Sequence, residues 1–179
     1  MQEFGRLVEA QIPRLRRYAR ALTGDVRRAD DLVQSCLLRA VAKQHLWQPG
    51  TDLRAWLFTI LHNQYVNDVR RSAREGANVQ IDDVASTLST QSNAFDSVQL
   101  RDLETAIAKL PPEQRQVILL VGLEGLPYEE VASILQVPIG TVRSRLSRGR
   151  DNLRRLMGMV QDETVATAPV GRAAVQPAA

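Results

Sequence analysis

The sequence predicts an all-α fold of two small helical domains joined by a flexible linker. Apolar residues recur at helical spacing up to about residue 74 and again from about residue 97, with no alternating strand pattern between them. The intervening segment, 72–96, is rich in Ser, Thr, Asn and Gln, a composition that buries little apolar surface and is typical of a linker. We therefore expect a first domain at 1–75, a flexible linker at 76–96, a second domain at 97–159 and a disordered tail at 160–179.

Composition is consistent with this division and indicates a polyanionic partner. The 179 residues, 44% of them hydrophobic, suffice for one or two small domains with real cores. The formal net charge is +3, and Lys43 and Lys109 are the only lysines. Arginines cluster at 14–20, 70–74 and 143–155. Arginine suits bidentate contacts to guanine and phosphate, although a compositional bias of the genome would give the same count.

The sequence indicates no catalytic, metal or cofactor site. A single cysteine, Cys36, excludes an internal disulfide and a multi-thiolate metal site within one chain, and we interpret it as a small apolar core residue. His45 and His62 have no His, Cys or carboxylate partner at metal-ligand spacing. The N-terminus has no apolar core of signal-peptide length, and no apolar run approaches a membrane span. We expect a cytoplasmic protein without membrane insertion.

The first domain contains two strong helical patterns, separated by a loop with a Pro-Gly turn. The first pattern carries Asp30 and Asp31 at its expected start, where acidic groups suit the helix dipole, and buries Leu32, Val33, Cys36, Leu37, Ala40 and Val41. After the Pro49-Gly50 turn, Thr51 or Asp52 can cap the next helix. That helix has a core stripe of Leu53, Trp56, Leu57, Ile60 and Leu61.

The opposite face of this helix is polar. It carries His62, Asn63, Val66 and Arg70, followed by Arg71 and Arg74. An amide, an imidazole and arginines could hold a nucleic-acid strand, and a solvated helix end explains the same residues equally well.

The second domain opens with an apolar stripe of Leu100, Leu103, Ile107 and Leu110 before Pro111-Pro112, and Pro112 or Glu113 can open the next helix. A second apolar helix over 117–121 is broken by the segment 122–127. Two short helical patterns then meet at Gln136-Val137-Pro138, and Pro138 can begin the second of them.

These last two helices predict a helix-turn-helix. At about 100° per residue, one side of the second helix is apolar and the other is small, polar and cationic. The expected buried positions are Val142, Leu146, Gly149 and Leu153, and the expected outward positions are Ser144, Ser147, Arg148 and Asp151, flanked by Thr141 and Arg143. A recognition helix presents such a face to the major groove of DNA. An ordinary surface hairpin with solvated arginines is the alternative.

Three segments together resemble the sigma-70 superfamily, specifically its two-domain extracytoplasmic-function sigma factors. They are Ala29-Asp30-Asp31-Leu32-Val33-Gln34 with Leu37-Leu38-Arg39-Ala40, then Leu53 to Ile60 with Asn63, and Leu110-Pro111-Pro112-Glu113-Gln114-Arg115 through Gly140-Thr141-Val142-Arg143-Ser144-Arg145-Leu146. The resemblance covers nearly the whole chain. It implies a protein without an active site that binds core RNA polymerase, directs it to promoter DNA and is held inactive by an anti-sigma factor.

The resemblance also implies roles for individual residues. Polymerase contacts fall on Asp31, Gln34 and Arg39, contacts to the minus-10 element on Trp47, Asn63, Arg70 and Arg71, and contacts to the minus-35 element on Thr141, Arg143, Ser144, Ser147 and Arg148. Trp47 could instead plug the core, an interpretation that we slightly favour. Ser147 departs from the bulkier residue of some members, which leaves the promoter sequence open.

Three other classes of protein compete with this interpretation. A helix-turn-helix regulator usually joins the motif to a receiver or ligand domain, and the first domain shows no receiver-like βα alternation. A sigma mimic that only sequesters an anti-sigma factor could lose its DNA-contacting arginines, whereas Arg143, Arg145, Arg148 and Arg150 are present. An enzyme has the least support, because no nucleophile–base pair, carboxylate cluster or phosphate loop is present.

Overall fold

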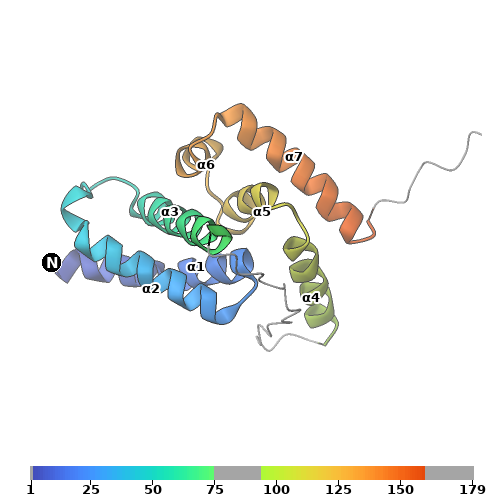
Figure 1. Ribbon diagram of the computed structural model, residues 1–179, viewed down its shortest axis with the longest axis horizontal. Helices are drawn as coiled ribbons and strands as arrows, with labels where there is room; N and C mark the ends of the chain where they lie inside the picture. The colour runs from blue at the N-terminus through green and yellow to red at the C-terminus, as the bar shows by residue number, and fades with distance from the viewer. Residues whose placement is uncertain (1, 75–93, 160–179) are drawn as a thin grey trace, which may run out of the picture.

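The computed structural model describes residues 2–74 and 94–159, and within these ranges every regular element is a helix (Figure 1). The predicted all-α class is confirmed. The predicted linker lies outside the described residues apart from its last three, and so does the predicted tail. The elements are α1 (Gln2–Thr23), α2 (Val26–Ala42), the 3-10 turn η1 (Gln44–Leu46), α3 (Leu53–Arg74), α4 (Ala94–Ala108), α5 (Pro112–Ile118), the π-helical turn η2 (Leu119–Leu123), α6 (Tyr128–Leu135) and α7 (Ile139–Leu156).

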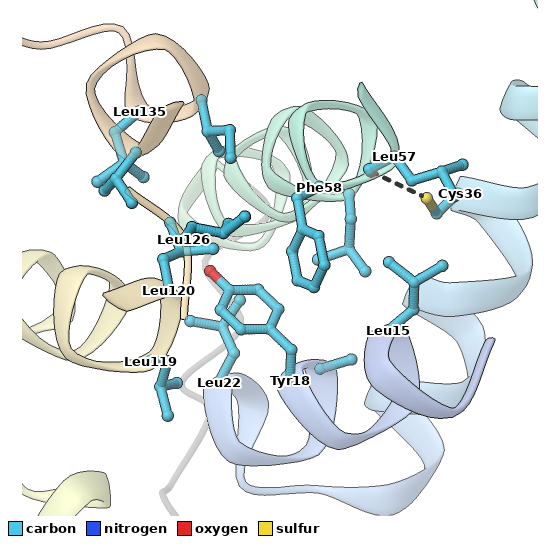
Figure 2. Packing of buried hydrophobic residues seen from close by; sticks show 14 of the residues in the cluster. Leu15, Tyr18, Leu22, Cys36, Leu57, Phe58, Leu119, Leu120, Leu126 and Leu135 are labelled. Carbon is cyan, nitrogen blue, oxygen red and sulfur yellow. Dashed lines mark hydrogen bonds between the residues drawn. The ribbon is translucent and has the colours of Figure 1, made fainter. Parts of the chain in front are cut away.

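The helices α1 to α3 form the first module, in which α2 packs against both α1 and α3. Its core includes the fully buried Leu15, Leu57 and Cys36. The Cys36 thiol lies 3.5 Å from the carbonyl oxygen of Leu57, to which it donates (Figure 2). Burial raises the pKa of this thiol to about 12, because a thiolate is poorly solvated there. The interpretation of Cys36 as a core residue is confirmed.

The start of α2 differs from the prediction. The helix begins at Val26, and the carboxylate of Asp25 caps it by accepting a 2.7 Å hydrogen bond from the backbone N–H of Arg28. Placing Asp30 and Asp31 at the helix start was therefore wrong, since both lie in its second turn. Gly24, with φ +69°, ends α1 and lets the chain reverse directly into the cap.

The start of α3 follows one of the predicted alternatives. The carboxylate of Asp52 accepts a 3.1 Å hydrogen bond from the backbone N–H of Ala55 and so caps the helix. Trp56 is only partly buried and packs edge-on against Phe4 of α1, with ring centroids 6.3 Å apart. His62, predicted on the polar face, is buried. That prediction was wrong because α3 packs against α1, α2 and α6, so its buried arc is wider than one stripe.

The helices α4 to α7 form the second module. Arg115 of α5 ties the end of α4 in place, since its guanidinium donates to the carbonyl oxygens of Ile107, Ala108 and Leu110. These carbonyls lie at a helix C-terminus, where no intrahelical donor is available. The predicted break after α5 is a π-helical turn followed by Gly125, whose φ of +66° redirects the chain into α6.

The two modules pack against each other and share one hydrophobic core. Helix α3 contacts α6, and α1 contacts η2 and α4. Figure 2 shows Tyr18, Leu22 and Phe58 of the first module facing Leu120 and Leu126 of the second. The rings of Tyr18 and Phe58 meet edge to face at 5.1 Å. The sequence predicted two domains on a flexible linker and did not predict this contact, because local periodicity carries no signal for contacts between distant segments.

Candidate nucleic-acid interface

The helix-turn-helix consists of α6 and α7, joined by a three-residue turn. Gln136 adopts the left-handed conformation, with φ 54° and ψ 45°, and closes α6 through backbone bonds to Ala132 and Ser133. The backbone N–H of Val137 also donates to the Ala132 carbonyl at 3.1 Å. Pro138, at φ −59°, then precedes the first residue of α7. A left-handed C-cap followed by proline ends one helix and starts another without a longer loop.

The buried face of α7 matches the prediction. Val142, Leu146 and Gly149 are buried, and Leu153 is partly buried against the core. This face packs on α5 and α6, which fixes the rotation of the helix. The side of α7 that faces solvent therefore follows from the packing.

The predicted minus-35 residues lie on or beside this solvent face. Arg143, Ser147 and Arg148 are exposed, whereas Thr141 and Ser144 are half-buried. The hydroxyl of Ser144 donates to the Thr141 backbone carbonyl at 3.1 Å, so the Ser144 side chain stays close to the helix backbone. The exposed arginines project furthest and are the groups best placed to reach a base edge or a phosphate.

A surface pocket of about 270 Å³ lies along α7 and the start of α6. Its lining consists of Tyr128, Arg143, Leu146, Ser147, Arg150, Asp151 and Arg154. Sequence reasoning missed Tyr128 as a member of this surface, and it counted Arg150 among the DNA-contacting arginines without placing it at the minus-35 site. Arg150 follows Ser147 by about one helical turn and shares its face, whereas Tyr128 comes from α6 and is placed there by tertiary packing.

The predicted minus-10 residues lie on the first module, apart from the α7 set. Asn63, Arg70 and Arg71 are exposed on α3. Trp47 is half-buried, and its ring packs 5.5 Å from that of Phe4. Its indole Nε1 is buried and has no hydrogen-bond partner among the described residues. The ring thus packs partly against the core.

The predicted polymerase contacts, Asp31, Gln34 and Arg39, are all exposed on α2. Two apolar side chains accompany them: Leu38 is 73% exposed and Val41 is 57% exposed. Val41 was predicted in the buried stripe, and that prediction was wrong because the packing of α2 on α1, α3 and η1 leaves its side chain exposed. The result is a mixed polar and apolar face.

No group of three His, Cys, Asp or Glu side chains able to hold a metal ion occurs in the described ranges. Over the same ranges, every helix is too short or too polar to cross a membrane.

Comparison with known proteins places both modules in one family. Residues 8–62 match the family model of the sigma2 domain of PhyR, and residues 100–153 match that of sigma-70 region 4. The chain is 41% identical over 148 residues to the ECF RNA polymerase sigma factor EcfG of Rhodopseudomonas palustris, covering 83% of this chain and 81% of that protein. It is 35% identical over 172 residues to the ECF sigma factor SigE of Mycolicibacterium smegmatis, covering 94% of this chain and 66% of that protein.

A solved structure agrees with these sequence matches. The sigma factor RpoE from Bartonella quintana, crystallised with the anti-sigma factor NepR, has a TM-score of 0.80 and 34% identity, covering 90% of this chain and 100% of that chain. The helix-turn-helix, the two matched regions and these relatives lead to one conclusion: the chain belongs to the extracytoplasmic-function family of RNA polymerase sigma factors.

Proposed function

We propose that the protein binds core RNA polymerase in the cytoplasm and directs promoter-specific transcription initiation without catalysing a reaction itself. The observation that carries the proposal is the exposed cationic face of α7, held outward by its opposite, buried face. A helix-turn-helix whose second helix presents arginines to solvent suits the major groove of DNA.

Helix α7 would read the minus-35 element. Arg143 and Arg148 are the candidates for contacts to guanine, because a guanidinium can donate two hydrogen bonds to O6 and N7. Ser147 lies between them on the exposed surface and leaves room for a base pair to approach the helix. Thr141 and Ser144, being half-buried, would contact the backbone of the same site.

The first module would hold the minus-10 element. Asn63, Arg70 and Arg71 follow the exposed side of α3, where an amide and two guanidinium groups could bind a single strand. Trp47 lies at the end of η1, just before the loop that leads into α3, and it is half-buried, so the accessible part of its ring could contact an unpaired base.

The exposed face of α2 would bind the polymerase. Asp31, Gln34 and Arg39 supply polar contacts there, and Leu38 and Val41 supply apolar area. Interfaces that combine a few exposed apolar side chains with a polar rim are typical of specific protein complexes.

An anti-sigma factor would control the protein. The support is the RpoE structure, a relative that aligns over its whole length with 90% of this chain and is bound to the anti-sigma factor NepR. Recovery of the protein from unstressed cells without any inhibitor would contradict this part of the proposal.

Single-round transcription with purified core polymerase on a promoter library tests the proposed function. The natural chain should support initiation, and Arg143→Ala with Arg148→Ala should reduce it by about tenfold or more, since each guanine contact contributes about 1–3 kcal/mol. The matched control is Arg6→Ala with Arg14→Ala, which removes the same charge from exposed positions on α1. Absence of initiation on every promoter would overturn the proposal.

A sigma mimic is the second candidate, because the matched model for residues 8–62 is that of the sigma2 domain of PhyR. A mimic would bind an anti-sigma factor and would fail in the transcription assay. Binding of an anti-sigma factor together with initiation would leave only the sigma-factor function.

A further inference from the structure

Two tryptophans of the first module share one aromatic partner. Phe4, in the first turn of α1, lies with its ring centroid 5.5 Å from that of Trp47, and the two ring planes are tilted by 47°. The same Phe4 ring meets Trp56 of α3 edge to face, at 6.3 Å and 72°. Within the described ranges, neither tryptophan has a further ring contact. Phe4 therefore links the end of η1 to the first turn of α3.

The loop between these two tryptophans is held by hydrogen bonds in its middle and at its α3 end. The Gln48 carbonyl accepts a bond from the backbone N–H of Thr51 at 3.2 Å and another from the Thr51 hydroxyl at 2.7 Å. The carboxylate of Asp52 caps α3 by accepting from the backbone N–H of Ala55 at 3.1 Å. Polar contacts thus define the path of the loop as it enters α3.

The η1 end of the loop has a different kind of anchor. The backbone N–H of Trp47 donates to the Gln44 carbonyl at 3.1 Å, but the indole Nε1 is buried without a hydrogen-bond partner among the described residues. The orientation of the Trp47 ring therefore depends on its packing against Phe4 and the core. Aromatic pairs prefer particular mutual orientations, which an aliphatic neighbour does not impose. Phe4 is thus the group that can fix how the Trp47 ring is presented.

We infer that Phe4 is a positioning residue for promoter opening: its ring holds Trp47 in the orientation that receives an unpaired base of the minus-10 element. The inference rests on the proposed function, in which Trp47 contacts that base. The start of α1 and the turn from α2 to α3 lie at the same end of the first module, so Phe4 reaches this loop although it is remote from it in sequence (Figure 1). Because a base stacks on the face of an aromatic ring, the extent of opening depends on how the Trp47 ring is oriented.

The fluorescence of Trp47 in the full-length chain measures the positioning directly. Trp47 and Trp56 are the two tryptophans of the sequence, so Trp56→Phe leaves Trp47 as the single indole fluorophore. In this background Phe4→Leu, which keeps an apolar side chain and removes the ring, should increase the quenching of Trp47 by acrylamide and lower its anisotropy. Phe4→Tyr, which keeps the ring, should retain the natural values. The matched control is Val8→Ala, which truncates a buried side chain one turn further along α1 and should leave both values unchanged.

Promoter opening by the holoenzyme measures the consequence. Permanganate reactivity of unpaired thymines, on a promoter that the natural chain uses, reports opening, and a footprint over the minus-35 element reports binding. Phe4→Leu should reduce opening by about two- to tenfold, the contribution of one aromatic pair to an equilibrium, and should leave the minus-35 footprint unchanged. Val8→Ala and Phe4→Tyr should open the promoter as the natural chain does. In a Trp47→Ala chain, Phe4→Leu should cause no further loss, because its effect passes through Trp47.

Three results would overturn the inference while the natural chain still opens promoters. They are unchanged quenching of Trp47 in Phe4→Leu, an equal loss of opening in Val8→Ala, and a loss from Phe4→Leu that persists in the Trp47→Ala chain. A role for Phe4 confined to core stability would give the second or the third. Failure of the natural chain to open any promoter would instead overturn the proposed function, and the inference with it, whatever the quenching shows, because that measurement needs neither polymerase nor DNA.

Discussion

Gly149 of α7 lies so close to Ile118 of α5 that a Cβ atom at this position would be 2.9 Å from the Ile118 Cγ1 and 3.3 Å from its Cδ1. Carbon atoms in contact prefer about 3.5–4.0 Å. Glycine therefore sets how closely α7 approaches α5, and this contact helps to fix which side of α7 faces solvent. The exposed cationic face thus depends on a residue that has no side chain.

Replacing Gly149 by Ala should destabilise the protein relative to the same change at Gly140. Both glycines are in α7, but a Cβ at Gly140 meets nothing within 4 Å. Alanine gains up to about 1 kcal/mol of helix propensity at either site. Overpacking against Ile118 should cost about 1–3 kcal/mol at Gly149 alone. Urea denaturation followed by circular dichroism measures the difference, and equal free energies of unfolding for the two variants would contradict the close approach.

The cap of α2 makes a separate prediction about stability. Asp25→Ala should lower the free energy of unfolding by about 1 kcal/mol, because it removes the acceptor for the Arg28 backbone N–H. Asp25→Asn should retain most of the stability, since an amide oxygen also caps. Asp31→Ala, at an exposed position inside the helix, is the control. A larger loss at Asp31 than at Asp25 would place the helix start where the sequence prediction put it.

His62 should make the protein less stable at mildly acidic pH. Burial lowers the pKa of His62 below its ordinary value, because the charged imidazolium is poorly solvated there. The unfolded chain therefore binds the proton first as the pH falls below about 6.5, and stability is lost until the folded form is protonated as well. Urea midpoints between pH 8 and pH 5 should fall for the natural chain and fall less for His62→Leu. The exposed His45→Gln is the control and should keep the natural slope.

Substitutions on α7 should distinguish contacts to base edges from contacts to phosphates. Arg143→Gln in the holoenzyme should weaken binding by about 1–3 kcal/mol and relax the sequence preference at one position of the minus-35 element. Arg155→Gln, at the exposed C-terminal end of the helix, should weaken binding about equally on all promoters and reduce the salt slope by about one if it contacts phosphate. Titration of promoter variants at several salt concentrations measures both, and an unchanged sequence preference for Arg143→Gln would exclude base readout there.

Local periodicity was sufficient to predict the helix-turn-helix and the orientation of α7. Val142, Leu146 and Gly149 recur at helical spacing, and one helix packing on one surface buries one stripe. The same helical spacing gave the wrong burial for His62 and Val41. Helix α3 has neighbours on several sides, which buries His62, whereas the end of α2 has few neighbours, which exposes Val41. A helical pattern shows which residues share a face and leaves open how many faces are covered.

By itself, the sequence determined the all-α class, the position of the recognition helix and the residue types that face solvent on it. These properties depend on residues within one or two helical turns of each other, and helical spacing encodes them. Only the tertiary structure decided that the two modules close on each other, because the ion pair between them joins Arg17 and Glu124, which are 107 residues apart in the chain. A carboxylate and a guanidinium become partners there only when packing excludes water from between two segments that no local pattern links.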